Sequence, residues 1–437
     1  MRALIEAHRS SEAYDAAAEA LKSAPQTAGM FSARGRAFFR QGDLTKAETS
    51  FQRALLIDPK FPYALAGLAT ILGGLGKHKT AETLVTQAYK AGPDDPEIIR
   101  QWANTLKGGA HVEALRRAVA ILDPETTEAK QLRAHIATDV ALGDRHPRVL
   151  ASEYRNYEIG LAEILNGPRI QRGIGLRVRF NGSYSATLLL DTGASGIDLS
   201  PKAVAKAGLE PLGEEGVEAQ GIGDRKAATS LRHLAREVRI GDLVLRDCPV
   251  SVFDGVRDAD ADGLIGADVF SKFLVQIDWP LLKLRLQPYP GMKAPPGDEA
   301  SDAEAQLPSG WQRIFYNGHL LIPTSVNGEP ARFFVIDSGA SANLIAIDAA
   351  RSSTKVHGDS NIVVRGIQGK VKDVSRADKV QLQFANFRQD NADIVAMDLS
   401  RISDLGGIEV GGLLGKPVLR QLVLTIDYRS AAIRLEH

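Results

Sequence analysis

The chain has 437 residues, of which 44% are hydrophobic and 24% are charged. These fractions are typical of folded globular proteins, so the composition excludes a disordered or fibrous chain. The length exceeds that of one ordinary hydrophobic core and predicts about three domains. Lysine plus arginine and aspartate plus glutamate both number 53. The net charge is therefore zero, and we expect no nucleic-acid partner, because such partners require a strongly basic surface.

The single cysteine, Cys248, excludes an internal disulfide and argues against a cysteine-based zinc site. It precedes Pro249 in an apolar strand pattern, so we expect a buried side chain rather than a reactive thiol. No apolar run is long enough for a membrane span, and the first residues lack a signal-peptide core. The final residues 435–437 (Leu-Glu-His) resemble a cloning-site scar ahead of a histidine tag, and we set them aside.

A period of about 34 residues runs through the front of the chain. Small residues, aromatic residues and a closing proline recur in two consecutive repeats: Gly35, Phe38, Ala47, Phe51, Ala54 and Pro59, then Ala69, Leu72, Ala81, Val85, Ala88 and Pro93. This pattern resembles the tetratricopeptide repeat, in which small residues let paired helices approach and a proline follows the second helix. The resemblance implies a helical-repeat domain, which we place at residues 1–165. A plain alanine-rich helical bundle is the alternative.

The repeat signal weakens after Trp102, but helical patterning continues over Glu128–Leu142 and Pro147–Leu165. We expect degenerate helical hairpins in both segments. The first repeat begins in mid-helix, so we expect the natural chain to extend further N-terminally. A removed export signal would suit a bacterial periplasmic protein, with the cytoplasm as the alternative. Tetratricopeptide-like domains have concave surfaces that hold peptides or proteins, so we expect a protein partner there, whose identity the pattern does not indicate.

The pattern changes near Gly167 to the period-two alternation of strands. From here the chain is duplicated, with the second copy following the first by about 146 to 149 residues. Four pairs of segments match in order: Asn181-Gly182 with Asn327-Gly328, Leu188–Ser195 with Phe334–Ser341, Gly263–Gly266 with Gly412–Gly415, and Gln276–Asp278 with Thr425–Asp427. We place the lobes at residues 170–290 and 311–434. The proline-, glycine- and acid-rich residues 291–310 are typical of a linker.

Each copy contains Asp-Thr/Ser-Gly-Ala-Ser after an apolar run, followed about 75 residues later by two apolar residues and a glycine. This arrangement resembles the aspartic proteases, including pepsin-like and retropepsin-like enzymes, over residues 170–434. The resemblance implies a multidomain fold: an all-α tetratricopeptide-like domain followed by an all-β bilobal protease fold in a single chain. It also implies that each lobe contributes one catalytic aspartate, namely Asp191 and Asp337.

The chemistry of this family needs two neighbouring carboxylates that share one proton and hold one water. No metal and no cofactor are required, and the expected substrate is a polypeptide. Gly193 and Gly339 would let the loop backbones approach the carboxylates. By resemblance, Thr192 and Ser338 hydrogen-bond across the lobe interface, while Gly266 and Gly415 belong to the strands that cross the two aspartate loops.

Ala194 and Ala340 stand where pepsin-like enzymes usually carry a hydroxyl residue that stabilises the ionised carboxylate. Without that hydroxyl the pKa values of the pair should rise, so we expect an activity optimum nearer neutral pH than that of pepsin.

Each lobe also has a glycine-rich segment in a strand context, with Gly221 and Gly223 in the first and Gly366 and Gly369 in the second. These are candidate flap tips that would cover the active site. An ordinary hairpin turn is the alternative, because glycine-rich turns are common.

Other patterns resemble metal-binding sites but do not meet their requirements. Asp258–Gly263 imitates a calcium loop, but the twelfth position is Val269 rather than glutamate, so we read an acidic turn. The histidines lack the spacing of metal ligands. Two rival functions stay open: a non-catalytic peptide-binding scaffold built on the protease fold, and an enzyme that acts only as a dimer of chains.

Overall fold

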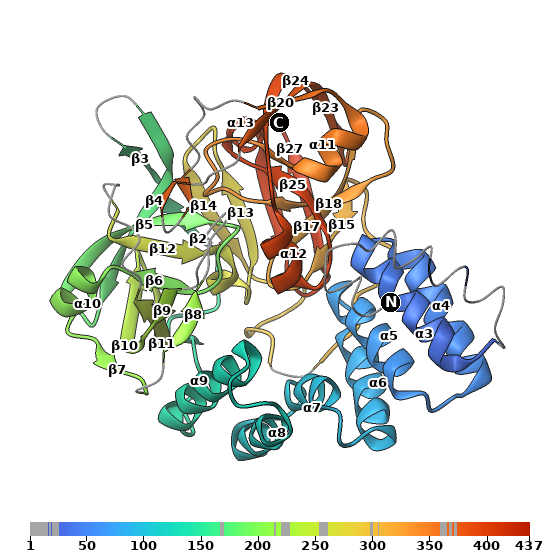
Figure 1. Ribbon diagram of the computed structural model, residues 1–437. Helices are drawn as coiled ribbons and strands as arrows, with labels where there is room; N and C mark the ends of the chain where they lie inside the picture. Colours follow the sequence, from blue (N-terminus) through green and yellow to red (C-terminus); the bar gives the residue numbers. More distant parts are fainter. Residues whose placement is uncertain are drawn as a thin grey trace. The chain divides into compact units, whose positions relative to one another are not determined.

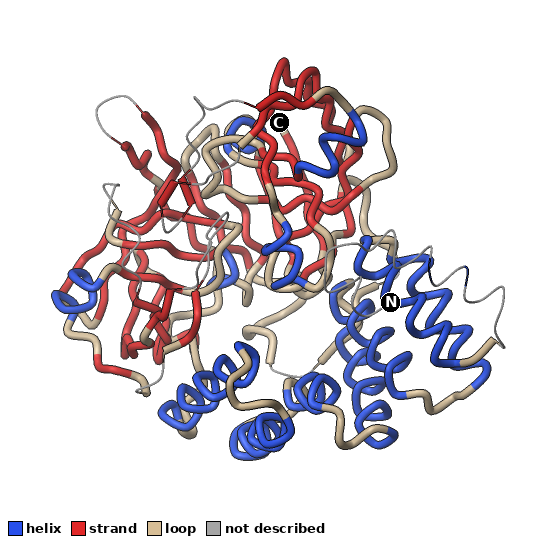
Figure 2. Tube along the Cα trace, in the orientation of Figure 1, coloured by secondary structure: helices blue, strands red, loops and turns tan. Residues whose placement is uncertain are grey.

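The computed structural model describes residues 16, 19, 26–166, 170–213, 216–219, 228–252, 261–297, 300–304, 306–358, 365–366, 369–370 and 374–437 (Figure 1). The chain divides into two compact units. The first comprises Met1–Ile136 with the short segments Ala300–Glu304 and Ile402–Glu409; the second comprises Ala137–Glu299, Ala305–Arg401 and Val410–His437. Figure 2 shows that the first unit is mainly helical and the second is built mainly of strands.

The helical unit is a series of antiparallel helix pairs. Its helices are α3 (Ala28–Gln41), α4 (Leu44–Ile57), α5 (Pro62–Gly74), α6 (His78–Ala91), α7 (Pro96–Ala103), α8 (Gly108–Ile121) and the first turns of α9 (Thr127–Leu142). The helices α3, α5 and α7 pack against α4, α6 and α8, respectively. The small and aromatic repeat positions are buried as expected, and Phe51 is 1% exposed at the centre of the first core cluster.

Two short later segments, Ala300–Glu304 and Ile402–Glu409, bind to the helices of this unit through a helix cap and an ion pair. Helix α6 has no cap from its own N-cap side chain. Asp302 supplies one: it accepts hydrogen bonds from the backbone N of Thr80 at 3.0 Å and from its hydroxyl at 2.6 Å. These hydrogen bonds lower the pKa of Asp302. The buried Arg40 pairs with Asp404 at 2.7 Å. Part of the predicted linker, residues 300–304, therefore packs within the helical unit.

The prediction of a helical hairpin over 147–165 is wrong. This segment forms β1 (Val149–Leu150), β2 (Tyr157–Gly160) and β3 (Ala162–Asn166), and the long helices end at Leu142. From Tyr157 to Leu161, buried and exposed residues alternate strictly. This alternation has the period of a strand, and the apolar residues that suggested a helix lie on one face of it.

The first lobe is a nine-stranded sheet closed into a barrel. Besides β1 and β3 it contains β4 (Ile170–Phe180), β5 (Tyr184–Asp191), β6 (Ile197–Leu199), β7 (Glu210–Pro211), β10 (Arg232–Ile240), β11 (Leu243–Val252) and β12 (Gly263–Gly266). The strand order is β1-β11-β6-β12-β5-β4-β10-β7, with β3 beside β4, and the pairing of β10 with β11 closes the sheet. The short helices of this lobe are α10 (Pro201–Ala207) and η1 (Ala267–Phe270).

The second lobe repeats this plan with eight strands. They are β16 (Phe315–Tyr316), β17 (Leu320–Val326), β18 (Arg332–Ile336), β19 (Leu344–Ala346), β20 (Val356–Gly358), β23 (Ser375–Phe384), β24 (Phe387–Met397) and β25 (Val410–Leu414). The order is β16-β17-β18-β25-β19-β24-β23-β20, closed by β17 with β23. Helices α11 (Ile347–Ser353), α12 (Ser400–Gly406) and α13 (Lys416–Leu419) are inserted in this stretch of the chain.

The two predicted Asn-Gly turns connect equivalent hairpins in the two lobes. Asn181 and Gly182 both have positive φ, at 48° and 68°, and Asn327 and Gly328 have 52° and 82°. Positive φ at two successive residues is the geometry of a type I′ β-turn, which Asn-Gly favours.

A third sheet joins the lobes. It contains β13 (Leu274–Asp278), β14 (Lys283–Gln287), β15 (Trp311–Arg313), β26 (Val423–Asp427) and β27 (Ala432–Glu436), in the order β15-β27-β26-β13-β14-β2. Gln276 lies directly opposite Thr425, its equivalent in the duplicated sequence. The pairing of two equivalent residues marks the pseudo-two-fold axis between the lobes. Leu435 and Glu436, set aside at first, complete β27.

Each lobe also carries a small separate hairpin in the region of the predicted flaps. In the first lobe β8 (Val217–Ala219) pairs with β9 (Ala228–Ser230), and the flap candidates Gly221 and Gly223 lie outside the described residues. In the second lobe β21 (Arg365–Gly366) pairs with β22 (Gly369–Lys370), which places Gly366 opposite Gly369. Among the residues with a described position, no helix is long and apolar enough to cross a membrane.

Tight helix packing in the first unit gives the first prediction. A Cβ atom added to Gly67 would lie 2.4 Å from Cζ of Phe51, which is fully buried. Gly67→Ala should therefore destabilise the helical unit by about 1–3 kcal/mol, despite the better helix propensity of alanine. Thermal unfolding followed by circular dichroism measures this.

Gly109→Ala is the matched control, since nothing lies within 4 Å of its added Cβ and no loss is expected. The smaller side chain in Phe51→Leu should relieve the clash, so the double variant should lose less than the sum of the two single changes. An additive loss would contradict the packing argument.

Candidate active site

The two predicted aspartates come from equivalent places in the two barrels. Asp191 ends β5, where it lies opposite Gly266 of the parallel strand β12. Asp337 directly follows β18, and its backbone N donates to the carbonyl oxygen of Leu414 in β25 at 3.0 Å. The apolar residues before each aspartate are buried, so the end of a core strand holds each carboxyl in place.

The two carboxyl groups lie within hydrogen-bonding reach of each other. Asp337 is 5% exposed. Burial raises the pKa of both groups, and the charge of Asp191 and its hydrogen bond raise that of Asp337 further, well above its ordinary value. Two like charges so close cannot both ionise easily, so we expect the pair to share one proton.

Hydrogen bonds from backbone amides offset part of the free-energy cost of burying two neighbouring carboxyl groups. The backbone N of Gly193 donates to Asp191 at 2.8 Å, and those of Gly339 and Ala340 donate to Asp337 at 2.9 Å each. A Cβ at position 193 would lie 2.8 Å from Cγ of Asp337, and one at position 339 would lie 2.3 Å from Oδ2 of Asp191. Each glycine therefore makes room for the carboxyl of the opposite lobe.

Thr192 and Ser338 form a closed hydrogen-bond network between the lobes. The backbone N of each donates to the hydroxyl of the other at 2.9 Å. The Thr192 hydroxyl donates to the carbonyl oxygen of Ile336 at 2.7 Å, and the Ser338 hydroxyl donates to that of Leu190 at 2.9 Å. Both residues are buried, at 4% and 2% exposure. This Thr192–Ser338 network spans the interface on which the relative position of the carboxyls depends.

Gly266 and Gly415 pack against the aspartate loops of their own lobes. The backbone N of Gly266 donates to Gly196 O at 2.7 Å, and a Cβ there would lie 2.6 Å from Ala194 O. A Cβ on Gly415 would lie 2.5 Å from Ala342 O. The Cβ of any other residue would displace the loop that holds the aspartate.

Different side chains support the two loops, and sequence reasoning missed them. In the first lobe Asp268 accepts from the backbone N of Gly196 at 2.8 Å and pairs with Arg148 at 2.9 Å. In the second lobe Asn343 accepts from the backbone N of Gly415 at 2.9 Å. The sequence could have indicated Asp268, because it follows the motif glycine Gly266 by two residues. No sequence pattern indicated Arg148, because 120 residues separate it from Asp268.

Two more charged groups near Asp191 were also missed. Burial lowers the pKa of His319, while the charge of Asp191 acts in the opposite direction. Its neighbour Gly318 accepts from the Ser195 hydroxyl at 3.3 Å, which ties this segment to the first aspartate loop. Asp198 lies in β6; burial first and the charge of Asp191 next raise its pKa to about 7.

The remaining candidates lie away from the dyad. Cys248 is fully buried, and burial raises the pKa of its thiol to about 12, so it is no nucleophile at ordinary pH. Asp262, at the end of the expected acidic turn, accepts from the backbone N of Thr187 and from the Tyr184 hydroxyl, both at 3.0 Å. In the part of the chain that the structure describes, no group of acidic, histidine or cysteine side chains could hold a metal ion.

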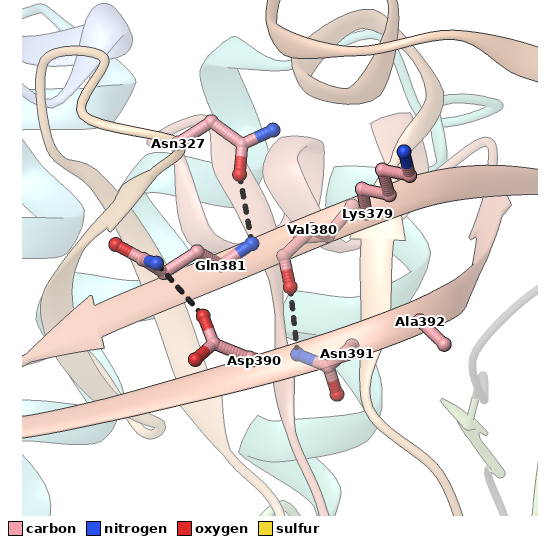
Figure 3. A pocket seen from close by; sticks show the side chains of 7 residues that line it. All are labelled: Asn327, Lys379, Val380, Gln381, Asp390, Asn391 and Ala392. Atoms are coloured by element: carbon pink, nitrogen blue, oxygen red, sulfur yellow. Dashed lines mark hydrogen bonds between the residues drawn. The ribbon is translucent and has the colours of Figure 1, made fainter.

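A pocket of about 380 Å³ lies on the hairpin of β23 and β24 (Figure 3). Its polar side chains bind neighbouring groups: the backbone N of Gln381 donates to Asn327 at 2.8 Å, the Gln381 side chain donates to Asp390 at 2.7 Å, and Asn391 donates to Val380 O at 3.1 Å. These contacts stabilise the hairpin and its turn, so we assign the pocket no chemistry.

Comparisons with known proteins agree with this division. A family model described as aspartyl protease matches residues 176–269 and 322–418, one stretch in each lobe. Two models described as tetratricopeptide repeat match residues 1–64 and 38–100. No curated protein matches the chain.

Two solved structures share short stretches with the chain. A mutant O-GlcNAc transferase from Thermobaculum terrenum is 19% identical over 27% of this chain and 23% of its own, with a TM-score of 0.24. The MamA RS-1 ArsTM double mutant is 20% identical over 33% of this chain and 82% of its own, with a TM-score of 0.26. Likenesses at these scores carry no argument about the fold or the function.

The interlobe network yields a stability prediction. Thr192→Val keeps the shape of the side chain but leaves the backbone N of Ser338 and the carbonyl of Ile336 buried without their partner. We expect a loss of about 2–4 kcal/mol in the free energy of unfolding, measured by urea denaturation. Thr192→Ser keeps the hydroxyl and should lose less than about 1 kcal/mol. Equal losses in the two variants would contradict the role of the hydroxyl.

The raised pKa of Asp198 predicts a pH-dependent stability. Between about pH 4 and pH 7 the folded protein keeps this proton while the unfolded chain releases it, so stability falls as the pH rises through this window. Asp198→Asn cannot ionise. It should match the original protein at pH 4 and exceed its unfolding free energy at pH 8 by up to about 4 kcal/mol.

Urea denaturation at the two pH values measures this difference. The control is Asp242→Asn, which removes a carboxyl from an exposed turn of the same lobe and should show no such crossover. If the difference in unfolding free energy between Asp198→Asn and the original protein were the same at both pH values, the argument would be refuted.

Proposed function

We propose that this chain, which carries an aspartyl protease domain in two copies together with tetratricopeptide repeats, is an endopeptidase that uses Asp191 and Asp337. The observation that carries the proposal is the pair of carboxyls within hydrogen-bonding reach of each other where the two lobes meet, with the pKa of both raised by burial. Such a pair offers one base and one acid side by side at the same pH.

In the proposed reaction Asp191 is the ionised member and Asp337 the protonated one. Asp191 removes a proton from a water molecule as the water oxygen attacks the carbonyl carbon of the peptide bond. Asp337 donates its proton to the carbonyl oxygen, which gives a tetrahedral diol. As the carbon–nitrogen bond breaks, the diol returns a proton to Asp337, and Asp191 passes its proton to the leaving amine. No covalent bond to the protein forms.

The contacts of the two groups support this assignment. The backbone N of Gly193 and the hydrogen bond with Asp337 lower the pKa of Asp191 against the effect of burial, whereas the charge of Asp191 raises that of Asp337. The Thr192–Ser338 network would hold the carboxyls in the geometry that proton sharing requires. We further propose that the helical repeats recruit or gate the polypeptide substrate, since such repeats hold peptides and proteins.

A non-catalytic peptide-binding scaffold is the rival function. Cleavage of unfolded casein separates the two. The proposed enzyme should cleave it, and Asp191→Asn and Asp337→Asn should each lose at least about 100-fold in rate, because each removes the acid or the base. Asp242→Asn is the control with a similar change of charge. Cleavage by the original protein no faster than by the two variants between pH 3 and pH 8 would favour the scaffold.

The dependence of the rate on pH tests the shared proton separately. Below the lower pKa of the pair both carboxyls are protonated and no base remains; above the upper one both are ionised and no acid remains. Burial raises both pKa values, so the bell-shaped profile of kcat/KM should peak nearer neutral pH than that of pepsin. A maximum below about pH 3 would contradict this.

A further inference from the structure

Asp198 and Asp191 project from the same face of the first barrel. Asp198 lies directly opposite Leu264, and Leu264 lies beside Leu189 of β5. Residues in register share a face of the sheet, and Asp191 follows Leu189 by two positions, so it shares that face as well. The carboxyl of Asp198 is therefore a cross-strand neighbour of the site, at the same end of the sheet as the dyad.

Apolar side chains lie beside Asp198 on one side of this face. Leu189 and Leu264 form a buried cluster with Ile164. The Ser251 side chain, opposite Asp198 on β11, hydrogen-bonds the carboxyl. Within the described part of the chain Asp198 forms no ion pair at 4 Å or less. Arg232 lies in register with Ser251 on the next strand and acts on Asp198 through its charge, without a direct ion pair. Burial removes the hydration of the carboxyl, and this more distant cation offsets only part of that cost.

The second lobe shows that the fold does not need a carboxyl at this position. The residue equivalent to Asp198 in the duplicated sequence is Leu344, which lies opposite Leu413 as Asp198 lies opposite Leu264. Leu344 is 5% exposed and packs as an ordinary core residue. The two halves of the site therefore differ in polarity at one pair of equivalent positions, and the acidic member serves something other than packing.

We infer that Asp198 forms an acidic subsite in the first lobe that receives a lysine or arginine side chain of the substrate. This inference rests on the proposed peptidase function and names a substrate class for it: polypeptides with a basic residue near the scissile bond. The substrate cation would form a direct ion pair with the carboxyl, closer than Arg232, and the Ser251 hydroxyl would remain as a second partner. A cation in the opposite lobe would meet Leu344 instead.

The charged groups that act on Asp198 set how its subsite responds to pH. Asp191 from β5 and Asp268 from η1 repel its ionised form, while Arg232 from β10 stabilises it. Binding of a cation requires this ionised form. The KM for basic substrates should therefore fall as the pH rises through about 7, whereas the KM for neutral substrates should not.

The test compares cleavage of matched peptides that carry lysine or the neutral, similarly sized methionine at each of the three positions on either side of the cleaved bond. At one position lysine should be preferred in kcat/KM by about 10- to 100-fold, mainly through KM. Asp198→Asn and Asp198→Leu should abolish this preference while they still cleave the methionine peptides. Asp242→Asn should retain it.

Equal cleavage of lysine and methionine peptides at every position, or a lysine preference that survives in Asp198→Asn, would overturn the inference. Casein cleavage is measured in parallel to separate this failure from failure of the peptidase proposal. If the original protein does not cleave casein, the peptidase proposal fails. The subsite is then judged by fluorescence anisotropy of labelled lysine and methionine peptides, where tighter lysine binding lost in Asp198→Asn supports it and equal binding overturns it.

Discussion

The organisation of the second unit depends on one constraint, which is that two acidic side chains must lie side by side with little access to solvent. Ionised together they would repel, and buried alone each would lose its hydration. Groups next to the carboxyls offset both the repulsion and the lost hydration. Three backbone amides donate to the carboxyls, two glycines admit them, and the Thr192–Ser338 network joins the loops that carry them.

The duplication explains why this arrangement is possible in one chain. Each barrel delivers an aspartate at the end of a buried strand, and a second strand ending in glycine crosses the loop that follows. The third sheet then joins the barrels about the axis on which Gln276 meets Thr425. Because each barrel supplies one carboxyl of the pair, the pair forms only where the two lobes meet, despite their separate cores.

Some equivalent positions in the two lobes carry different residues, and these differences show where the two halves of the site differ chemically. The first aspartate loop is supported by Asp268 and the second by Asn343, so the same mechanical task is met by different chemistry. The pair Asp198 and Leu344 differs without any difference in backbone pairing. The two halves of the site therefore differ at this position in the side chain alone.

The sequence by itself determined the helical repeats, the duplicated β lobes and the candidate pair Asp191 and Asp337. Each of these depends on local features: a period of small residues, an alternation of apolar residues, or a short motif that occurs twice. The same reasoning failed over 147–165, where apolar residues fitted a helix and a strand equally well until pairing with β14 selected the strand.

Only the tertiary structure decided which charged groups surround the dyad. Arg148, Asp268 and His319 come from parts of the chain distant from Asp191, and no spacing rule connects them with it or with the nearer Asp198. Barrel closure brings them together, and burial then lowers the pKa of His319 and raises that of Asp198. Pairing between distant strands is a property of the whole fold, so a linear pattern can name the two carboxyls but not the electrostatic environment that sets their pKa values.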